Sequence, residues 1–250
     1  MSQAILAVYV VLGSIGAIAA VLAGLSRSLV KAGWAARQRR ATLTAVALVL
    51  MAWAGATTVL AWLDAYQGGP GRFPMLPVAI LAPVVVGALL IRHSAVAWRL
   101  VEAVPQQWLV GVQLYRAGGA VFLVLWAGGQ LPGQFALPAG LGDVATGLLA
   151  PVAALAWARN PANGTAAVRR WNLLGLGDLA VAFVTGWATG PRLAPLLGID
   201  APNALIDRFP LVLIPAFIVP LSAILHIASL AKLRQAVGRS APAAGSVASA

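Results

Sequence analysis

The chain alternates between long apolar runs and short polar segments. Each run is close to the ~20 residues that a helix needs to cross ~30 Å of hydrocarbon. The seven runs cover residues 4–25, 42–63, 74–91, 108–127, 137–157, 171–190 and 210–230. This pattern predicts an all-α fold, a seven-transmembrane-helix bundle that forms a single domain over residues 1–235.

Three segments need a separate interpretation. Residues 92–106 are mixed in character, which favours an amphipathic helix on the membrane interface over a plain loop, although both fit the pattern. Residues 236–250 are mostly Ala, Ser, Gly and Pro, a composition typical of a disordered tail. The first run resembles a signal peptide around Ala17 to Ala19, but no Lys or Arg precedes it, so we expect a retained helix.

Composition supports a membrane protein. Hydrophobic residues make up 61% of the chain and charged residues 9%, against roughly 25% charged in a soluble domain. The chain has no cysteine, which excludes disulfides, a thiolate nucleophile and zinc or iron-sulfur sites with cysteine ligands.

The net charge is +11, but the basic residues fall between apolar runs and not on one soluble face, so no nucleic-acid partner is predicted. Their distribution instead predicts an orientation in the membrane. Thirteen of the 17 Lys and Arg residues lie in loops of one side. They are Arg27, Lys31, Arg37, Arg39, Arg40, Arg92, Arg99, Arg159, Arg169, Arg170, Lys232, Arg234 and Arg239. The positive-inside rule then places the N-terminus outside and the C-terminus in the cytoplasm. The preference for Arg over Lys is a hint of a GC-rich bacterial genome, and therefore of the bacterial inner membrane.

The tetrapeptide Gly-Leu-Gly-Asp occurs twice, ending at Asp143 and at Asp178. Both aspartates fall inside apolar runs, where an unpaired charge costs at least a few kcal/mol. An ionisable residue at this depth is a hypothesis for a functional site, so both are candidates for a proton or ligand site. At 1.5 Å per residue, Asp143 is expected roughly 9 Å below one boundary and Asp178 roughly 10 Å below the other.

Four further polar residues in the apolar runs complete the candidate set. Arg116 and His226 are the ionisable members, and Gln113 and Tyr115 are their expected hydrogen-bonding neighbours. In depth, Arg116 is within reach of either aspartate, and the pairs expected are Arg116 with Asp143 and His226 with Asp178. The alternative is a structural role for both residues. Arg116 would then fix the register of the helices, and His226 would be hydrogen-bonded to a neighbouring carbonyl and would not ligate a metal or haem.

The remaining carboxylates are not expected to carry chemistry. Three are interpreted as outer-loop residues and one as part of the interfacial helix; they are Asp64, Asp200, Asp207 and Glu102. The glycines before the two aspartates have two accounts, close packing of a neighbouring helix or a loosened helix that exposes backbone groups. Prolines at 210, 215 and 220 predict a bend in the last helix.

Two resemblances follow from these motifs. Gly-x-Gly-Asp resembles the motif of intramembrane aspartyl proteases, which implies two aspartates around one water. The depths above put the carboxylates about 10 Å apart along the membrane normal, too far for a shared-proton pair. The stretch from Gln113 to Asp143 is similar to bacterial multi-pass membrane proteins of unassigned function, a resemblance that covers the last four helices and implies no mechanism.

Three classes of function fit this sequence. Two motif copies on antiparallel helices favour a small-solute or proton-coupled transporter. A non-catalytic sensor or assembly subunit that binds a partner helix is the first alternative, and an intramembrane enzyme on a lipid or isoprenoid substrate is the second. The partners expected are the bilayer, a small solute or lipid, and a membrane protein. No catalytic residue or metal is predicted, and the sequence identifies no cofactor.

Overall fold

The computed structural model describes residues 1–67, 73, 75–199 and 203–240, and the described part of the chain is helical with no strand. The predicted all-α fold is confirmed. The α-helices are α1 (Gln3–Lys31), α2 (Ala36–Trp62), α3 (Met75–His93), α4 (Ala95–Ala103), α5 (Gln106–Gly111), α6 (Ala120–Ala127), α7 (Gly133–Arg159), α8 (Pro161–Ala188) and α9 (Val219–Ser240). Three segments between them have another helical geometry: η1 (Val112–Gly119) and η2 (Ala194–Leu197) are 3₁₀-helical, and η3 (Ile214–Ile218) is a π-helical turn.

Six helical segments of the described chain are long and apolar enough to cross a membrane, which is the pattern of a multi-pass membrane protein. They are Gln3–Lys31, Ala36–Trp62, Met75–His93, Gln106–Ala127, Gly133–Arg159 and Ile214–Ala236. The seventh expected segment corresponds to α8, which is not one of the six. It is 28 residues long, but Arg169, Arg170, Asn172 and Asp178 lower its hydropathy.

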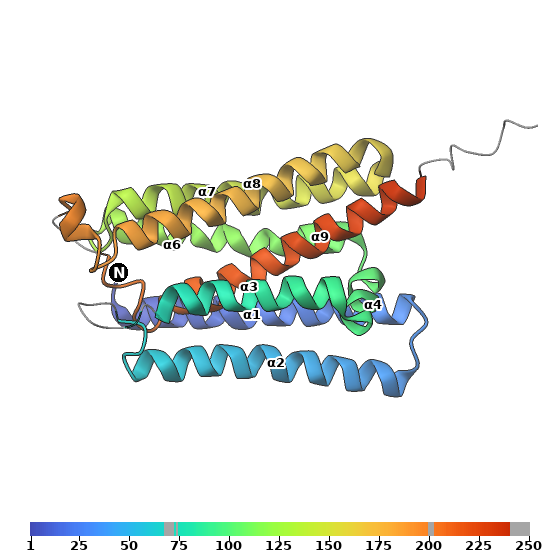
Figure 1. Ribbon diagram of the computed structural model, residues 1–250, viewed down its shortest axis with the longest axis horizontal. Helices are drawn as coiled ribbons and strands as arrows, with labels where there is room; N and C mark the ends of the chain where they lie inside the picture. Colours follow the sequence, from blue (N-terminus) through green and yellow to red (C-terminus); the bar gives the residue numbers. More distant parts are fainter. Residues whose placement is uncertain (68–72, 74, 200–202, 241–250) are drawn as a thin grey trace, which may run out of the picture.

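The helices form an elongated bundle with two ends (Figure 1). One end, which we call the N-terminal end, holds Met1, the turn between α6 and α7 and the long connection from α8 to η3. The other, the basic end, holds the α1–α2 and α7–α8 connections, α4 and the end of α9. α7 packs against α8, α6, α5 and η1, whereas α9 packs against α3, α8 and α5. The polar residues of interest therefore gather where η1, α7, α8 and α9 meet.

Two expected segments can be compared with the helices. α4 is a nine-residue helix within the stretch 92–106. α9 ends at Ser240, so its last five residues belong to the segment 236–250 that was expected to be disordered. The rest of that tail, 241–250, lies outside the described residues, as does Asp200.

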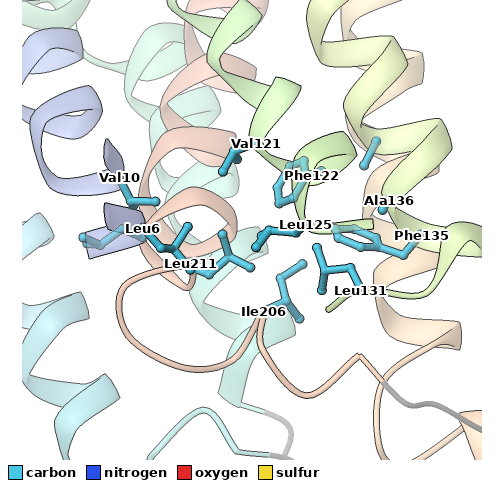
Figure 2. Close-up of a cluster of buried hydrophobic side chains, with 12 residues drawn as sticks. Leu6, Val10, Val121, Phe122, Leu125, Leu131, Phe135, Ala136, Ile206 and Leu211 are labelled. Atoms are coloured by element: carbon cyan, nitrogen blue, oxygen red, sulfur yellow. The ribbon is translucent and has the colours of Figure 1, made fainter. Parts of the chain in front are cut away.

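A hydrophobic cluster closes the bundle at the N-terminal end (Figure 2). It joins α1, α6, α7 and the segment before η3, and Phe122 and Phe135 pack edge to face at its centre, with ring centroids 5.2 Å apart. Its buried members are Leu6, Val10, Val121, Phe122, Leu125, Leu131, Phe135, Ala136, Ala139, Ile206, Leu211 and Leu213. The cluster fixes the ends of the helices whose middles carry the polar residues.

A tryptophan hydrogen bond fastens α2 to the last helix. Pro220 has no N–H, so the carbonyl of Ala216, four residues earlier, lacks its usual helical donor. The Trp53 indole N–H donates to that carbonyl at 3.1 Å, and the Trp53 ring packs edge to face on Phe217. Trp53 therefore lies in mid-helix, away from the interface, because it satisfies a carbonyl that proline leaves open.

Trp53→Phe should lower the free energy of unfolding in detergent by about 1–2 kcal/mol, because it leaves the Ala216 carbonyl without a donor in an apolar setting. Trp62→Phe is the matched control, since Trp62 is 68% exposed, and its effect should stay within about 0.5 kcal/mol. Chemical denaturation of the two variants in the same detergent makes the comparison. Equal losses would contradict the role given to the indole N–H.

Candidate functional site

The site begins with an unusual backbone segment. η1 keeps 3₁₀ geometry over eight residues, whereas such runs rarely exceed 3–4 and often mark a functional hinge when they interrupt an α-helix. Gly147 of α7 makes room for it, because a Cβ there would lie 2.3 Å from the backbone nitrogen of Ala117. The close approach of the two backbones directs Arg116 into the interior, where it is 2% exposed.

Arg116 binds both motif aspartates. Its Nε donates to Asp143 Oδ1 at 2.9 Å, and Nη2 lies 2.8 Å from the same oxygen. Nη2 also forms an ion pair with Asp178 Oδ2. Nη1 donates to the Gly175 carbonyl at 3.3 Å and contacts His226 Nε2 at 3.1 Å. The guanidinium thus joins η1 to α7, α8 and α9.

The bonds of His226 fix its tautomer. A guanidinium only donates, so His226 Nε2 accepts from Arg116 and the ring proton lies on Nδ1. Nδ1 then donates to Asn172 Oδ1 at 2.9 Å, and the Asn172 amide donates to Ser229 Oγ at 2.8 Å. The Gln106 amide donates to the same hydroxyl at 2.6 Å. A chain of hydrogen bonds therefore runs from the start of α5 to Arg116.

The expected pairing is half right. Arg116 pairs with Asp143, but it also pairs with Asp178, and His226 bonds to Asn172 and Arg116 instead of Asp178. The depth estimate was wrong because the helices are longer than the apolar runs. Asp143 lies ten residues after the start of α7 and Asp178 ten residues before the end of α8, so both lie at one level of this antiparallel pair.

The motif glycines make room for the polar side chains. A Cβ on Gly142 would lie 1.6 Å from Asp178 Oδ1, and one on Gly175 would lie 2.3 Å from the His226 ring. A Cβ on Gly119 would lie 2.5 Å from Asp143 Oδ2. Both α7 and α8 are unbroken helices, which favours the close-packing account for Gly142 and Gly175, whereas a Cβ on Gly177 would meet no atom within 4 Å.

Gln113 and Tyr115 lie on η1 but outside this network. The Tyr115 hydroxyl is 2.9 Å from Ser222 Oγ. Gln113 is fully buried, and neither of its amide atoms has a hydrogen-bond partner within the described chain.

The sequence did not indicate Asn172 and Ser229 as members of the site, because an uncharged polar residue near the polar end of a helix gives no signal.

The network carries an uneven charge. Arg116 supplies one positive charge and the two aspartates supply two negative charges, while the bonds of His226 suit the neutral ring. Of the cationic side chains described, Arg116 alone forms ion pairs with these aspartates. With both carboxylates ionised, the Arg116–Asp143–Asp178 cluster has a net charge of −1, which is costly in an apolar interior.

Two cavities meet at Asp143. The first, of about 110 Å³, extends from Asp143 toward the N-terminal end between α3, α7, α8 and η3. The second, of about 780 Å³, lies between α1, η1 and α9 and reaches Arg116. Both are lined by Asp143, Leu179, Ile214 and Val219. Asp143 is therefore approached from two directions, and three apolar side chains stand between them.

The first cavity is mostly apolar with polar residues at its far end. Asp207, expected as a loop residue, is 6% exposed and lines it, as does Asn203. Tyr66 lines it too, and burial raises the pKa of its phenol, which keeps the hydroxyl a hydrogen-bond donor at neutral pH. By contrast, Asp64 lies on the surface, where the Gln67 amide donates to it.

The chemistry of the cluster limits what it does. The guanidinium contacts both carboxylates, so they do not face one water as the aspartates of a shared-proton protease pair would. Among the described residues, no group of three or more His, Cys, Asp or Glu is placed to hold a metal ion. The arrangement suits binding and release of one positive charge.

Comparison with known proteins gives a family without an activity. A family model described as a domain of unknown function, DUF8737, matches residues 73–234. The match covers α3 to α9 through Arg234, and with them all members of the cluster. No curated protein and no solved structure gives a significant match.

Proposed function

The chain belongs to the DUF8737 family of unknown function, and from its geometry we propose that it is a proton-coupled carrier of a small, mostly apolar solute. The observation that carries this proposal is the place of Asp143. It is bound by Arg116 in a cluster with one excess negative charge, and it lines both cavities. In this mechanism a proton and the solute alternate at Asp143.

The charge balance supports coupling to protons. A net charge of −1 inside the bundle is relieved by one proton or by one positively charged group of a solute. Either takes the place of the other at the same carboxylates. Loss of the proton to one side and binding of the solute from the same side then form one exchange step.

Two hinge elements support alternating access. η1 carries Arg116, and the π-helical turn η3 carries Ile214, one of the residues between the cavities. Segments of 3₁₀ and π geometry within longer helices are typical of functional sites. Small changes in these two segments would open one cavity to Asp143 while Leu179 and Val219 close the other.

The proposal includes a seventh span and an orientation. α8 packs along α7 for most of its length (Figure 1), and its charged Asp178 forms an ion pair with Arg116. A crossing by α8 also keeps the basic loops on one side, as the positive-inside rule requires. We therefore place the N-terminus outside and the C-terminus in the cytoplasm of a bacterial inner membrane.

Proteoliposomes containing a trapped pH-sensitive dye test this function. A panel of small cationic, neutral and anionic amphiphiles is added outside, and protein-free vesicles correct for passive entry. We expect at least one class to change the internal pH with the wild-type protein and not with Asp143→Asn, since the variant cannot exchange the proton.

Gly177→Ala is the matched control, because a Cβ at Gly177 would meet no atom within 4 Å. It lies next to Asp178 and should transport like the wild type. No solute-driven pH change beyond that of empty vesicles, across all three classes, would contradict the proposal.

A further inference from the structure

We propose that the first cavity is a binding site for an organic cation with a hydrogen-bonding group at its far end. The cation would lie against Asp143 and the far group against Asn203. This inference rests on the proposed function, for which it names the solute class. Three features of the cavity support it: its aromatic lining, its charge and the state of Asn203.

The lining of the cavity is rich in aromatic rings. Tyr66, Phe122, Phe135, Phe183 and Trp187 all line it, and Phe122 and Phe135 are almost fully buried. The faces of aromatic rings attract organic cations, and cages of such rings recognise quaternary ammonium groups. Phe122 is the ring near the level of Asp143, whereas Phe135 and Trp187 lie eight and nine residues along their helices from Asp143 and Asp178. An alkyl body suits the remaining apolar wall.

Asp143 supplies a negative charge where this cavity meets the second one. The lining also includes one further carboxylate, the buried Asp207, and one guanidinium, the exposed Arg192. An anionic ligand would add to the excess negative charge of the cluster, and a neutral ligand would leave it in place. A cation removes it without adding a proton. Of the three charge classes, a cation is therefore the one that the cluster favours.

Asn203 provides the second anchor. It is 1% exposed and lines the cavity, yet neither its side-chain oxygen nor its nitrogen has a partner in the described chain. A buried amide without partners is destabilising, so a ligand that supplies partners is favoured. Its backbone is held in place, because its N–H donates to the Thr189 carbonyl at 2.7 Å. The open donor and acceptor suit a hydroxyl, amide or carbonyl of the solute.

The two anchors set the reach of the ligand. Thr189 follows Asp178 by eleven residues along α8, which is about 16 Å at 1.5 Å per residue. Asp143 lies at the level of Asp178. The side chains of Asp143 and Asn203 each cover part of that span, and a chain of about six to eight carbons between the cation and the far polar group spans the rest. Such a ligand is larger than the cavity of about 110 Å³, so side chains of the lining have to move outward when it binds.

Calorimetric titration of the purified protein in detergent tests the site with three matched probes. They are 6-hydroxyhexyltrimethylammonium, hexyltrimethylammonium and the neutral analogue in which tert-butyl replaces the trimethylammonium group. We expect both cations to bind saturably and the neutral analogue at least tenfold more weakly. Asp143→Asn should weaken both cations about tenfold or more.

Asn203→Ala separates the second anchor from general damage. It should weaken the hydroxylated cation about fivefold, the value of one hydrogen bond, and leave hexyltrimethylammonium within twofold. Equal weakening of both cations, equal binding of the neutral analogue, or no saturable binding of either cation would overturn the inference.

This result is distinguishable from failure of the proposed function. Proton exchange driven by another solute class, without cation binding, would contradict the proposed solute class and support the carrier function. Saturable cation binding that depends on Asp143 and Asn203, with no proton movement in vesicles, would support the binding site and contradict the carrier function.

Discussion

Arg116→Met should lower the free energy of unfolding by about 3–5 kcal/mol, the usual cost of removing one partner of a buried ion pair. The variant leaves Asp143 and Asp178 as two carboxylates without a cation in the middle of the bundle. It also removes the donors to the Gly175 carbonyl and to His226. Thermal and chemical unfolding in detergent measure the loss.

Two further variants separate charge from packing. The triple variant Arg116→Met, Asp143→Asn, Asp178→Asn has no charge left in the cluster and should recover most of the loss, since uncharged replacement of buried ion pairs is often neutral. Asp178→Asn alone makes the cluster neutral and should leave stability within about 0.5 kcal/mol or raise it. If Asp178→Asn lowered the free energy of unfolding as much as Arg116→Met does, the claim that the cluster carries an unbalanced negative charge would be contradicted.

Gly142→Ala should destabilise the protein by about 3 kcal/mol and abolish transport. The added Cβ would lie 1.6 Å from Asp178 Oδ1, so the carboxylate has to leave its place beside Arg116. Overpacking in a filled interior costs about 1–3 kcal/mol, and the loss of the ion pair brings the effect to the upper end. Unfolding in detergent and the dye assay in vesicles report the two effects.

Gly177→Ala, in the second copy of the motif, should act in the opposite direction. No atom lies within 4 Å of its added Cβ, so the helix gains about 0.5–1 kcal/mol from replacing glycine by alanine. If the two substitutions changed stability alike, the glycines would act through backbone flexibility and not through the space they leave for Asp178.

The sequence was enough to predict the helical class and most of the site. The apolar runs identified every long helix, because twenty apolar residues in a row have few other uses. Arg116, Asp143, Asp178 and His226 stood out since charge within such runs is rare. The bounds were less certain, as α8 begins ten residues before its apolar run.

The contacts of the site could not be predicted, because they depend on which helix faces which. Hydropathy gives depth and not lateral position, and an error in helix ends moved the two aspartates apart. The bond between His226 and Asn172 joins α9 to α8, and no sequence pattern indicates that pairing. The 3₁₀ geometry of η1 also has no clear local signal, since it arises where η1 packs against Gly147 of α7.

Trp53 and the glycines illustrate the same limit. A mid-helix tryptophan and a proline 167 positions later in the chain give no sign in sequence that they share one carbonyl. The two accounts of Gly142 and Gly175 could not be separated until the neighbouring side chains were placed. In each case the residue type was informative, but its partner was set by tertiary packing.

The most direct test of the central claim is the infrared absorption of protonated carboxyl groups in the reconstituted protein, recorded as a function of pH. If the cluster takes up one positive charge, the wild type should show one buried carboxylic acid band that disappears as pH rises. Asp143→Asn and Asp178→Asn should both lack it, because each variant already balances Arg116 with one carboxylate. A band that persists in either single variant, or no titrating band in the wild type, would contradict the account.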